Sequence, residues 1–261
     1  LGSLISDELL ISKEKVEVAS SICKVDLVSD LVGEFPELQG IMGGYFSTHQ
    51  GFDKDISLAI TEQYLPVGLD SKISKKPFSV ALSVSDKIDA HLHDNDIHYL
   101  TGDITNENVT EAIKWILSAN LNKKPKRTLK LYINSVGGDL YESFALIDVM
   151  KDSYHHISTV GIGAVMSASL LIFASGKHGE RYIAKNTGVM NHQHSDAMES
   201  KMHDMRSQMK ENNNCELRCL NILREATGYS LAEVRKKLNT PSDQYFTAKQ
   251  MIENKLADHI L

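Results

Sequence analysis

Three residues in the second half of the chain are of the types that hydrolytic enzymes use: Ser167, His192 and Asp243. Ser167 lies in the string GAVMSAS, where a predicted strand gives way to a helix, so its hydroxyl could stand exposed at the positive end of that helix. His192 follows a strand-like run, GVMN, and Asp243 lies in a Pro-Ser-Asp turn. A serine attacks an amide only if a base takes its proton, and the base needs an acid to fix its tautomer. The three residues could form such a set or hold separate structural roles, because the chain has eleven His and many Ser.

A Gly-Gly turn adds a second candidate feature. Gly137 and Gly138 come directly after the run LKLYIN, which has the pattern of a buried strand. Since glycine has no Cβ, backbone N–H groups at this turn can approach a bound ligand closely, as an oxyanion hole requires. An ordinary turn between a strand and a helix would use the same residues. From the residues alone, both interpretations stay open.

Strands and helices alternate around these residues. We expect strands at residues 97–101, 129–134, 157–162, 181–183 and 188–191. We expect helices at residues 106–119, 141–151, from the Ser167 region to 174, and 199–226. This alternation predicts an α/β fold with right-handed crossovers.

The first part of the chain has a helical pattern instead. Residues 13–32 place apolar side chains at spacings of three and four, and residues 56–64 and 80–88 repeat that period. We find no nucleophile–base pair, phosphate loop or metal-ligand spacing here. The doublet His93-Asp94 lacks further ligands, so it does not predict a metal site.

Composition bounds the class of protein. The 261 residues are 42% hydrophobic and 24% charged, which excludes a disordered, collagen-like or disulfide-rich chain. No apolar run reaches the roughly 18 residues that span a bilayer, and no secretory signal is recognisable, so we expect a cytoplasmic protein without a membrane partner. Cys215 and Cys219 share one helical face without a second ligand pair, which favours reduced thiols over a metal site. A chain that begins at Leu1 is expected to be a processed product or part of a longer reading frame.

Charge divides the chain. The part through His93 has eight Lys and no Arg against fourteen Asp and Glu, which is a net charge of −6. The remainder is balanced, with 20 basic and 20 acidic residues. This difference predicts two segments, and neither is basic enough for nucleic-acid binding.

The second segment resembles ClpP, the proteolytic subunit of the Clp protease, over about residues 95–261. The resemblance rests on INSVGGD, the GxxxS string that ends at Ser167, NTGVMNHQ, and the DQYFTAK string that begins at Asp243. It implies that Ser167 is the nucleophile, His192 the general base and Asp243 the orienting acid. It also implies that Gly138 and Ala168 donate the oxyanion-hole N–H groups, within a ClpP/crotonase-type fold of repeated β-β-α units.

The same resemblance implies an assembly and a substrate class. It implies a ring-shaped homo-oligomer, a heptamer or double heptamer, that hydrolyses unfolded polypeptides without a metal or organic cofactor. ATP would be used only by a separate AAA+ unfoldase. The chain departs from the family at Val136 and His194, which replace prolines, and at HSDAMES (194–200), which replaces the glycine-rich strand that binds substrate.

The first segment resembles the β subunit of bacterial-type glycyl-tRNA synthetase over about residues 1–90. The strings that carry this resemblance are VGEFPELQGIMGGYF, SLAITEQYLP and VALSVSDKID. Such a piece is a minor part of that subunit and should not charge tRNA by itself. The junction lies between about residues 80 and 96, and the join is either a selected fusion or a joined reading frame.

The leading hypothesis is a serine endopeptidase with a Ser-His-Asp triad. A crotonase-like acyl-CoA enzyme is an alternative, because it shares the fold type and a glycine-based oxyanion hole but uses carboxylates for its chemistry. A non-catalytic glycyl-tRNA synthetase β-subunit fragment joined to a ClpP-like chain is the third hypothesis.

Overall fold

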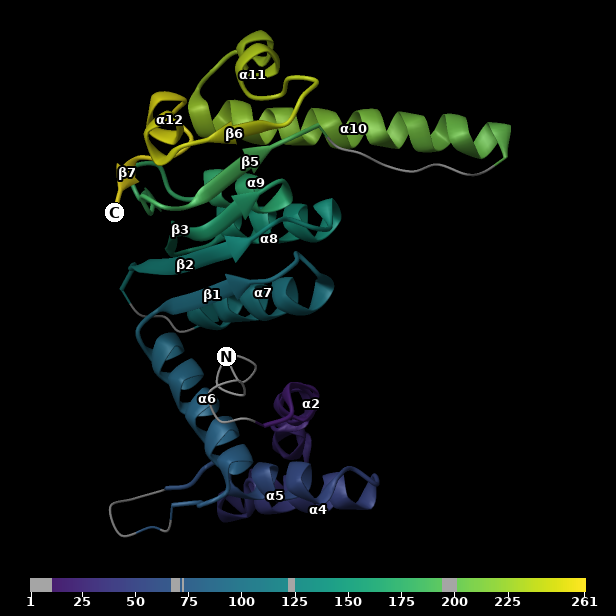
Figure 1. The fold of residues 1–261 in the computed structure, drawn as a ribbon, viewed down its shortest axis with the longest axis vertical. Helices are drawn as coiled ribbons and strands as arrows, with labels where there is room; N and C mark the ends of the chain where they lie inside the picture. The colour runs from purple at the N-terminus through teal and green to yellow at the C-terminus, as the bar shows by residue number, and fades with distance from the viewer. Residues whose placement is uncertain (1–10, 67–70, 72, 122–124, 194–200) are drawn as a thin grey trace. The chain divides into compact units, whose positions relative to one another are not determined.

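The computed structural model describes residues 11–66, 71, 73–121, 125–193 and 201–261. Its backbone contacts divide the chain into two compact units, Leu1–Asp94 and Asn95–Leu261 (Figure 1). Each unit has a hydrophobic core of its own. The division falls at the end of a single helix, α6 (Pro77–Asp94), so residues 80–94 of the expected junction are one continuous helix.

The first unit is helical throughout its described part. Its elements are α2 (Lys13–Ile22), η1 (Val25–Val28), α3 (Asp30–Glu34), η2 (Pro36–Leu38), α4 (Ile41–His49), α5 (Lys54–Glu62) and α6. The core is formed by Val16, Ala19, Cys23, Ile56, Ala59, Ile60, Phe78 and Leu82. These residues come from α2, α5 and α6 and from the residue that follows α2, so the apolar spacing read from the sequence is the spacing that the core uses.

The helix expected over residues 13–32 is wrong in its length. The α-helix ends at Ile22, and a 3₁₀ turn and the short α3 follow. The buried Asp26 explains the break, because its carboxylate accepts a hydrogen bond of 2.5 Å from the backbone N–H of Gly40, where α4 begins. Ser29 then caps α3 through its side chain. A tertiary contact to a residue 14 positions away therefore overrides a helical pattern.

The Gly-Gly pair of the string IMGGYF has a packing role. A Cβ on Gly44 would collide with the Thr61 hydroxyl and would lie 3.0 Å from the carbonyl oxygen of Ser57. A Cβ on Gly43 would lie 2.8 Å from the Ile60 side chain. Only glycine therefore lets α4 and α5 approach this closely, and the two helices pack directly against each other.

The second unit is built on one sheet, which has seven strands within the described residues. The strands are β1 (Ile97–Thr101), β2 (Thr128–Ser135), β3 (His156–Met166), β4 (Arg181–Ile183), β5 (Gly188–Asn191), β6 (Gln244–Phe246) and β7 (His259–Ile260). The order is β1-β2-β3-β4-β7, and β5 pairs with both β3 and β6. All pairs are parallel except β5–β6. The expected α/β fold is confirmed, and its sheet is mainly parallel.

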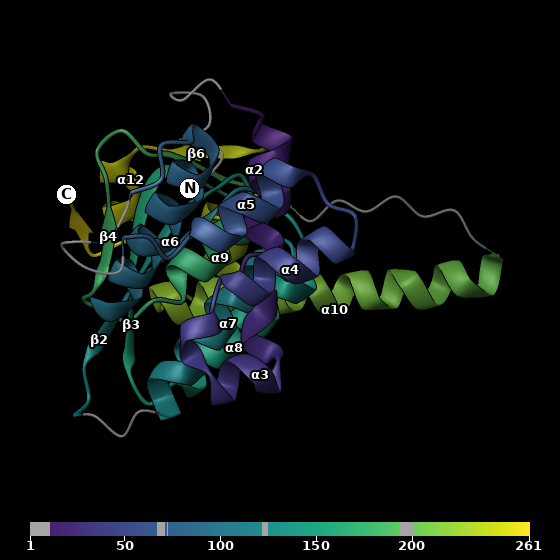
Figure 2. The same cartoon turned by 90° about the horizontal axis from the view of Figure 1, so that it is seen from below.

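Helices follow most of the strands. They are α7 (Asn106–Leu121), α8 (Leu140–Asp152), α9 (Ala168–Ala174), α10 (Met202–Thr227), α11 (Leu231–Lys237) and α12 (Ala248–Glu253). In this unit α7, α8 and α9 lie side by side, and α10 projects well past the sheet (Figures 1 and 2). None of the helices in the described ranges of the chain is long and apolar enough to cross a membrane.

Strand β3 has two different partners along one edge. Its first half pairs with β4, from Thr159 to Gly161, and its last residues pair with β5, from Ala164 to Met166. The strand is therefore longer than the expected residues 157–162. This change of partner brings β5 to the end of β3, where the candidate nucleophile follows.

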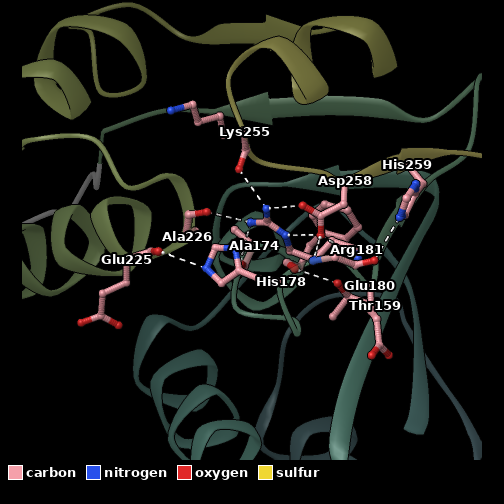
Figure 3. A network of polar contacts seen from close by, with 12 residues as sticks. Thr159, Ala174, His178, Glu180, Arg181, Glu225, Ala226, Lys255, Asp258 and His259 are labelled. Carbon is pink, nitrogen blue, oxygen red and sulfur yellow. Dashed lines mark hydrogen bonds and ion pairs between the residues drawn. The ribbon is translucent and has the colours of Figure 1, made fainter.

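Arg181, at the start of β4, is 2% exposed and donates all five of its N–H groups (Figure 3). Asp258 accepts two of these bonds, at 2.9 and 2.7 Å, and the carbonyls of Ala174, Ala226 and Lys255 accept the others. Burial alone would raise the pKa of Asp258, but the hydrogen bonds and charge of Arg181 hold that pKa below its ordinary value. The ion pair therefore stabilises the fold above the ordinary carboxyl pKa, and this contribution is lost as pH falls through the lowered pKa.

We expect Arg181→Met to destabilise the second unit by about 3–5 kcal/mol at pH 7, because Asp258 and three carbonyls lose their donors. The measurement is urea unfolding followed by the fluorescence of Trp115, which is 6% exposed in the core of this unit. Lys177→Met, at an exposed position, is the control and should change stability by less than about 0.5 kcal/mol. Equal midpoints for the two variants would contradict this prediction.

Candidate active site

Ser167 occupies a sharp turn between β3 and α9. Its backbone has φ 54° and ψ −126°, which a residue with a Cβ adopts only at a cost of about 1–3 kcal/mol. Local hydrogen bonds hold this conformation: the N–H of Ser167 donates to the carbonyl of Met190 at 2.9 Å, and the Ser167 carbonyl accepts from Leu170 at 3.0 Å. The strained turn places the half-buried serine at the carboxyl end of the central strand.

His192 meets Ser167 because of the strand register. Strand β5 pairs in parallel with the end of β3, with Met190 opposite Met166, so the next residues of both chains leave the sheet together. The Ser167 hydroxyl and His192 Nε2 are 2.7 Å apart, which is hydrogen-bond distance. With Nε2 unprotonated, the imidazole accepts the bond and can take the hydroxyl proton. The structure thus brings together two of the three residues singled out in the sequence.

Asp243 lies just outside the β5–β6 pairing. The antiparallel register sets Asn191 opposite Gln244, and one further step would set His192 opposite Asp243. The carboxylate of Asp243 is exposed and has no hydrogen bond to His192, both residues being within the described ranges. Asp243 therefore lies one residue before the β5–β6 pairing and has no hydrogen bond to the imidazole.

The Gly-Gly turn packs against the serine. A Cβ on Gly137, whose φ is 107°, would lie 2.7 Å from the Cβ of Ser167 and 2.9 Å from the carbonyl oxygen of Met166. A Cβ on Gly138 would collide with the backbone of Ile104. Among the described residues, the backbone N–H groups of Gly138 and Ala168 have no hydrogen-bond acceptor. The Gly-Gly turn and the start of α9 thus each offer one free donor, and both residues line the same cleft as Ser167.

Two neighbouring serines have structural partners. Ser169 is fully buried, and its hydroxyl donates to the carbonyl of Ser135 at 2.8 Å and accepts from the N–H of Met166 at 2.8 Å. The buried Ser135 hydroxyl accepts from the N–H of Gly137 at 3.1 Å. Ser169 and Ser135 therefore hold the Gly-Gly turn against the end of β3, and their positions do not favour them as nucleophiles.

A cleft of about 340 Å³ opens beside the Ser167–His192 pair. Its wall on α10 includes Cys215, Cys219 and Leu223, and Leu171 of α9 faces the same space. Burial raises the pKa of Cys219 to about 12, so this thiol stays protonated at neutral pH and serves as apolar lining. Within the part of the chain that the structure describes, no group of three or more His, Cys, Asp or Glu could hold a metal ion.

Tyr141 joins the start of α8 to α10 at the rim of this cleft. Its hydroxyl donates to Glu211 at 3.1 Å and lies 3.5 Å from Cys215 Sγ. The contact with the Cys215 thiol, together with desolvation and Glu211, raises the pKa of Tyr141 to about 12. The hydroxyl therefore remains a donor across the neutral pH range, and it ties the helix that follows the Gly-Gly turn to α10.

The side chains of Asn191 and Gln193 were not among the candidates that the sequence pattern indicated. The Asn191 amide donates to the carbonyl of Leu238, and the Gln193 amide donates to the carbonyl of Asn239 at 3.2 Å. These two residues flank His192. The signal that could have found them in the sequence is an amide side chain on each side of the candidate histidine. The expected departure at 194–200 lies outside the described residues.

The second unit is therefore an α/β domain with a hydrogen-bonded serine–histidine pair beside a glycine turn. A model of the Clp protease family matches residues 82–261, and a model of the glycyl-tRNA synthetase beta subunit matches residues 1–93. The chain belongs to the Clp protease family, and its first part matches the synthetase family. Both resemblances read from the sequence are confirmed, and the two matched ranges overlap within α6, at residues 82–93.

Individual relatives show the same division. The chain is 33% identical to the ATP-dependent Clp protease proteolytic subunit 1 of Leifsonia xyli subsp. xyli over 165 residues, which are 63% of this chain and 82% of that protein. It is 44% identical to the glycine–tRNA ligase beta subunit of Thermodesulfovibrio yellowstonii over 90 residues, which are 34% of this chain and 13% of that protein. The corresponding subunit of Solidesulfovibrio magneticus is 54% identical over 71 residues, 10% of its length. The chain thus spans only about an eighth of the synthetase subunits that it matches.

We expect Gly137→Ala to abolish fluorophosphonate labelling of the protein. The added Cβ would lie only 2.7 Å from the Cβ of Ser167 and would push the serine out of its position. Gly33→Ala is the control: a Cβ there meets nothing within 4 Å, and labelling should equal that of the wild type. Mass spectrometry of the intact protein measures the labelled fraction. Normal labelling of Gly137→Ala would show that the close approach of the turn to Ser167 is not required.

Proposed function

We propose that residues 95–261 are a serine endopeptidase domain that hydrolyses unfolded polypeptides. The observation that carries this proposal is the 2.7 Å hydrogen bond between the Ser167 hydroxyl and His192 Nε2 at the edge of a cleft. The family membership supports a protease, and the named relative is a Clp protease proteolytic subunit. The serine mechanism and its residues are the parts that we propose.

In the proposed reaction the Ser167 oxygen attacks the scissile carbonyl carbon while His192 Nε2 takes the hydroxyl proton. The C–N bond then breaks as His192 gives this proton to the leaving amine, which leaves an acyl-enzyme on Ser167. Water, with its proton taken by His192, releases the acid product and restores the serine. Each proton moves over one hydrogen bond, so the observed Ser–His distance needs no large rearrangement.

Gly138 and Ala168 are the proposed oxyanion donors. Both N–H groups are free and both residues line the cleft beside Ser167: Gly138 lies in a turn without Cβ atoms at 137 and 138, and Ala168 follows the serine at the start of α9. A donor already oriented toward a developing negative charge stabilises the tetrahedral intermediate without reorganisation. The strained backbone of Ser167 keeps the Ala168 N–H at the first turn of α9, where intrahelical acceptors are lacking.

Asp243 is the proposed orienting acid. The β5–β6 register supports this role, since it pairs Asn191 with Gln244, and His192 and Asp243 are the next residue on each chain. A small rotation of an exposed loop side chain is enough to change its hydrogen-bond partner. We propose that closure of the cleft on a polypeptide, or packing of neighbouring subunits, brings the Asp243 carboxylate to the imidazole.

A ring is the proposed assembly, with the active sites facing a shared chamber. Apolar side chains that are exposed in the single chain support it, among them Leu217 at 46%, Met209 at 58% and Tyr245 at 68%. We propose a cytoplasmic protease that needs no metal or organic cofactor and that takes substrates from a separate AAA+ unfoldase. The relative's name describes an ATP-dependent protease, and this supports an ATP-using partner.

The crotonase-like alternative is less well supported. It requires carboxylates that are free to act, and Asp139 and Glu216 do line the cleft. Asp139 accepts from the N–H groups of Tyr141 and Glu142, and Glu216 pairs with Arg235 at 2.6 Å. Both carboxylates are therefore engaged in holding helices. For residues 1–93 we propose a synthetase-like helical unit without aminoacylation activity.

The decisive test of the proposed function uses Ser167→Ala. We expect a fluorophosphonate to label wild-type Ser167 and the variant to lose peptide hydrolysis by a factor on the order of 10³ or more. Ser207→Ala, at an exposed position on α10, is the matched control and should retain full activity. Labelling at another serine, or an active Ser167→Ala protein, would overturn the assignment.

The first unit provides a second test. Residues 1–93 have a net charge of −6, so in a ring several such segments would repel one another, although screening limits the repulsion at physiological salt, where the Debye length is about 8 Å. We expect deletion of residues 1–93 to raise the rate on a fluorogenic peptide and to raise it further on an unfolded protein. Light scattering should show an oligomer for the shortened chain. Equal rates for both chains on both substrates would show that the first unit does not obstruct entry.

A further inference from the structure

The end of α11 is capped by side-chain amides from the neighbouring strands. The last carbonyls of a helix have no intrahelical donors, so they need partners from elsewhere. Three successive carbonyls, those of Lys237, Leu238 and Asn239, each accept one amide N–H. The donors are Gln244 of β6, at 3.0 Å from the Lys237 oxygen, and the two residues that flank His192.

We call Asn191 and Gln193, together with the carbonyls of Leu238 and Asn239, the amide clamp. Asn191 and Gln193 reach the carbonyls of two successive residues, so both side chains lie on the α11 side of the chain, while the His192 ring meets Ser167. Within β5, Val189 and Asn191 are buried. Because both flanking side chains are bound to the α11 end, His192 is directed to the opposite side, where Ser167 lies.

The nucleophile is attached to the same strand by its backbone. The Ser167 N–H donates to the Met190 carbonyl, and Met190 is the residue before Asn191. The clamp therefore holds the histidine from one side, and the Met190 carbonyl holds the serine from the other. A displacement of about 1 Å between a base and its nucleophile is enough to reduce a rate by about 100-fold.

We propose that the amide clamp is the device that positions His192 against Ser167, so that Asn191 and Gln193 are positioning residues of the peptidase. This inference rests on the proposed function and deepens it. Amides suit the task because they donate to carbonyls without carrying charge. A carboxylate at either position would face a carbonyl oxygen and repel it.

The test replaces each donor by an apolar side chain of similar size, in Gln193→Met, Asn191→Leu and the double variant of the full chain. We expect kcat per titrated active site to fall by about 10- to 100-fold in each single variant, with KM within about twofold of wild type. The double variant should lose less than the product of the single losses, because both donors hold one histidine. Gln50→Met, at an exposed position in the first unit, is the matched control.

Several readouts separate positioning from a general loss of structure. A merely structural role would lower the number of sites that a fluorophosphonate titrates and would shift unfolding followed by Trp115, while leaving kcat per site unchanged. Gln193 is exposed, so Gln193→Met should fold even if the buried Asn191→Leu does not. Wild-type kcat per site in Gln193→Met would overturn the inference.

A wild-type protein that neither labels nor cleaves peptides would contradict the proposed function instead. The inference then has its own measurement, an electron cryo-microscopy map of Gln193→Met beside that of the wild type. We expect the variant's imidazole to leave the 2.7 Å contact with Ser167. An unchanged imidazole position would overturn the positioning role regardless of activity.

Discussion

The packing of the second unit depends on the hydrogen bonds that the buried guanidinium of Arg181 donates. A fully buried charge is tolerated only if every donor finds an acceptor, and Arg181 satisfies this with Asp258 and three backbone carbonyls. Those carbonyls, of Ala174, Ala226 and Lys255, belong to the end of α9, the end of α10 and the segment before β7. One side chain thereby fixes α9 and α10, two of the helices that line the cleft, relative to the sheet.

The candidate site follows from this fixed frame. Strand β3 changes its partner from β4 to β5, and the change sets the chain after β5 beside the turn after β3. That geometry accounts for three features of the site. The backbone of Ser167 is strained, the glycine pair packs closely against it, and the hydroxyl is hydrogen-bonded to His192. Functional sites commonly hold such strain, because the surrounding fold stabilises a conformation that the local sequence disfavours.

Both units use a glycine pair to bring two segments close together, but the segments differ. In the first unit glycines at 43 and 44 let two helices approach, whereas in the second glycines at 137 and 138 let a turn approach a serine. A Gly-Gly pair is therefore not a functional signal in itself. The first pair packs against the Thr61 hydroxyl, which donates to the carbonyl of Ser57, whereas the second packs against Ser167, whose hydroxyl is hydrogen-bonded to an imidazole.

The sequence by itself determined the alternation of strands and helices, the position of Ser167 at a strand-to-helix junction and the two families. These depend on local periodicity and on contiguous strings, which a single chain displays. Only the tertiary structure decided the break at Asp26 and the pairing of Ser167 with His192, 25 residues away. The same holds for the amides that cap α11 and for the position of Asp243 one residue before the β5–β6 pairing. Each depends on strand register and on hydrogen bonds between distant residues, which leave no periodic trace in the sequence.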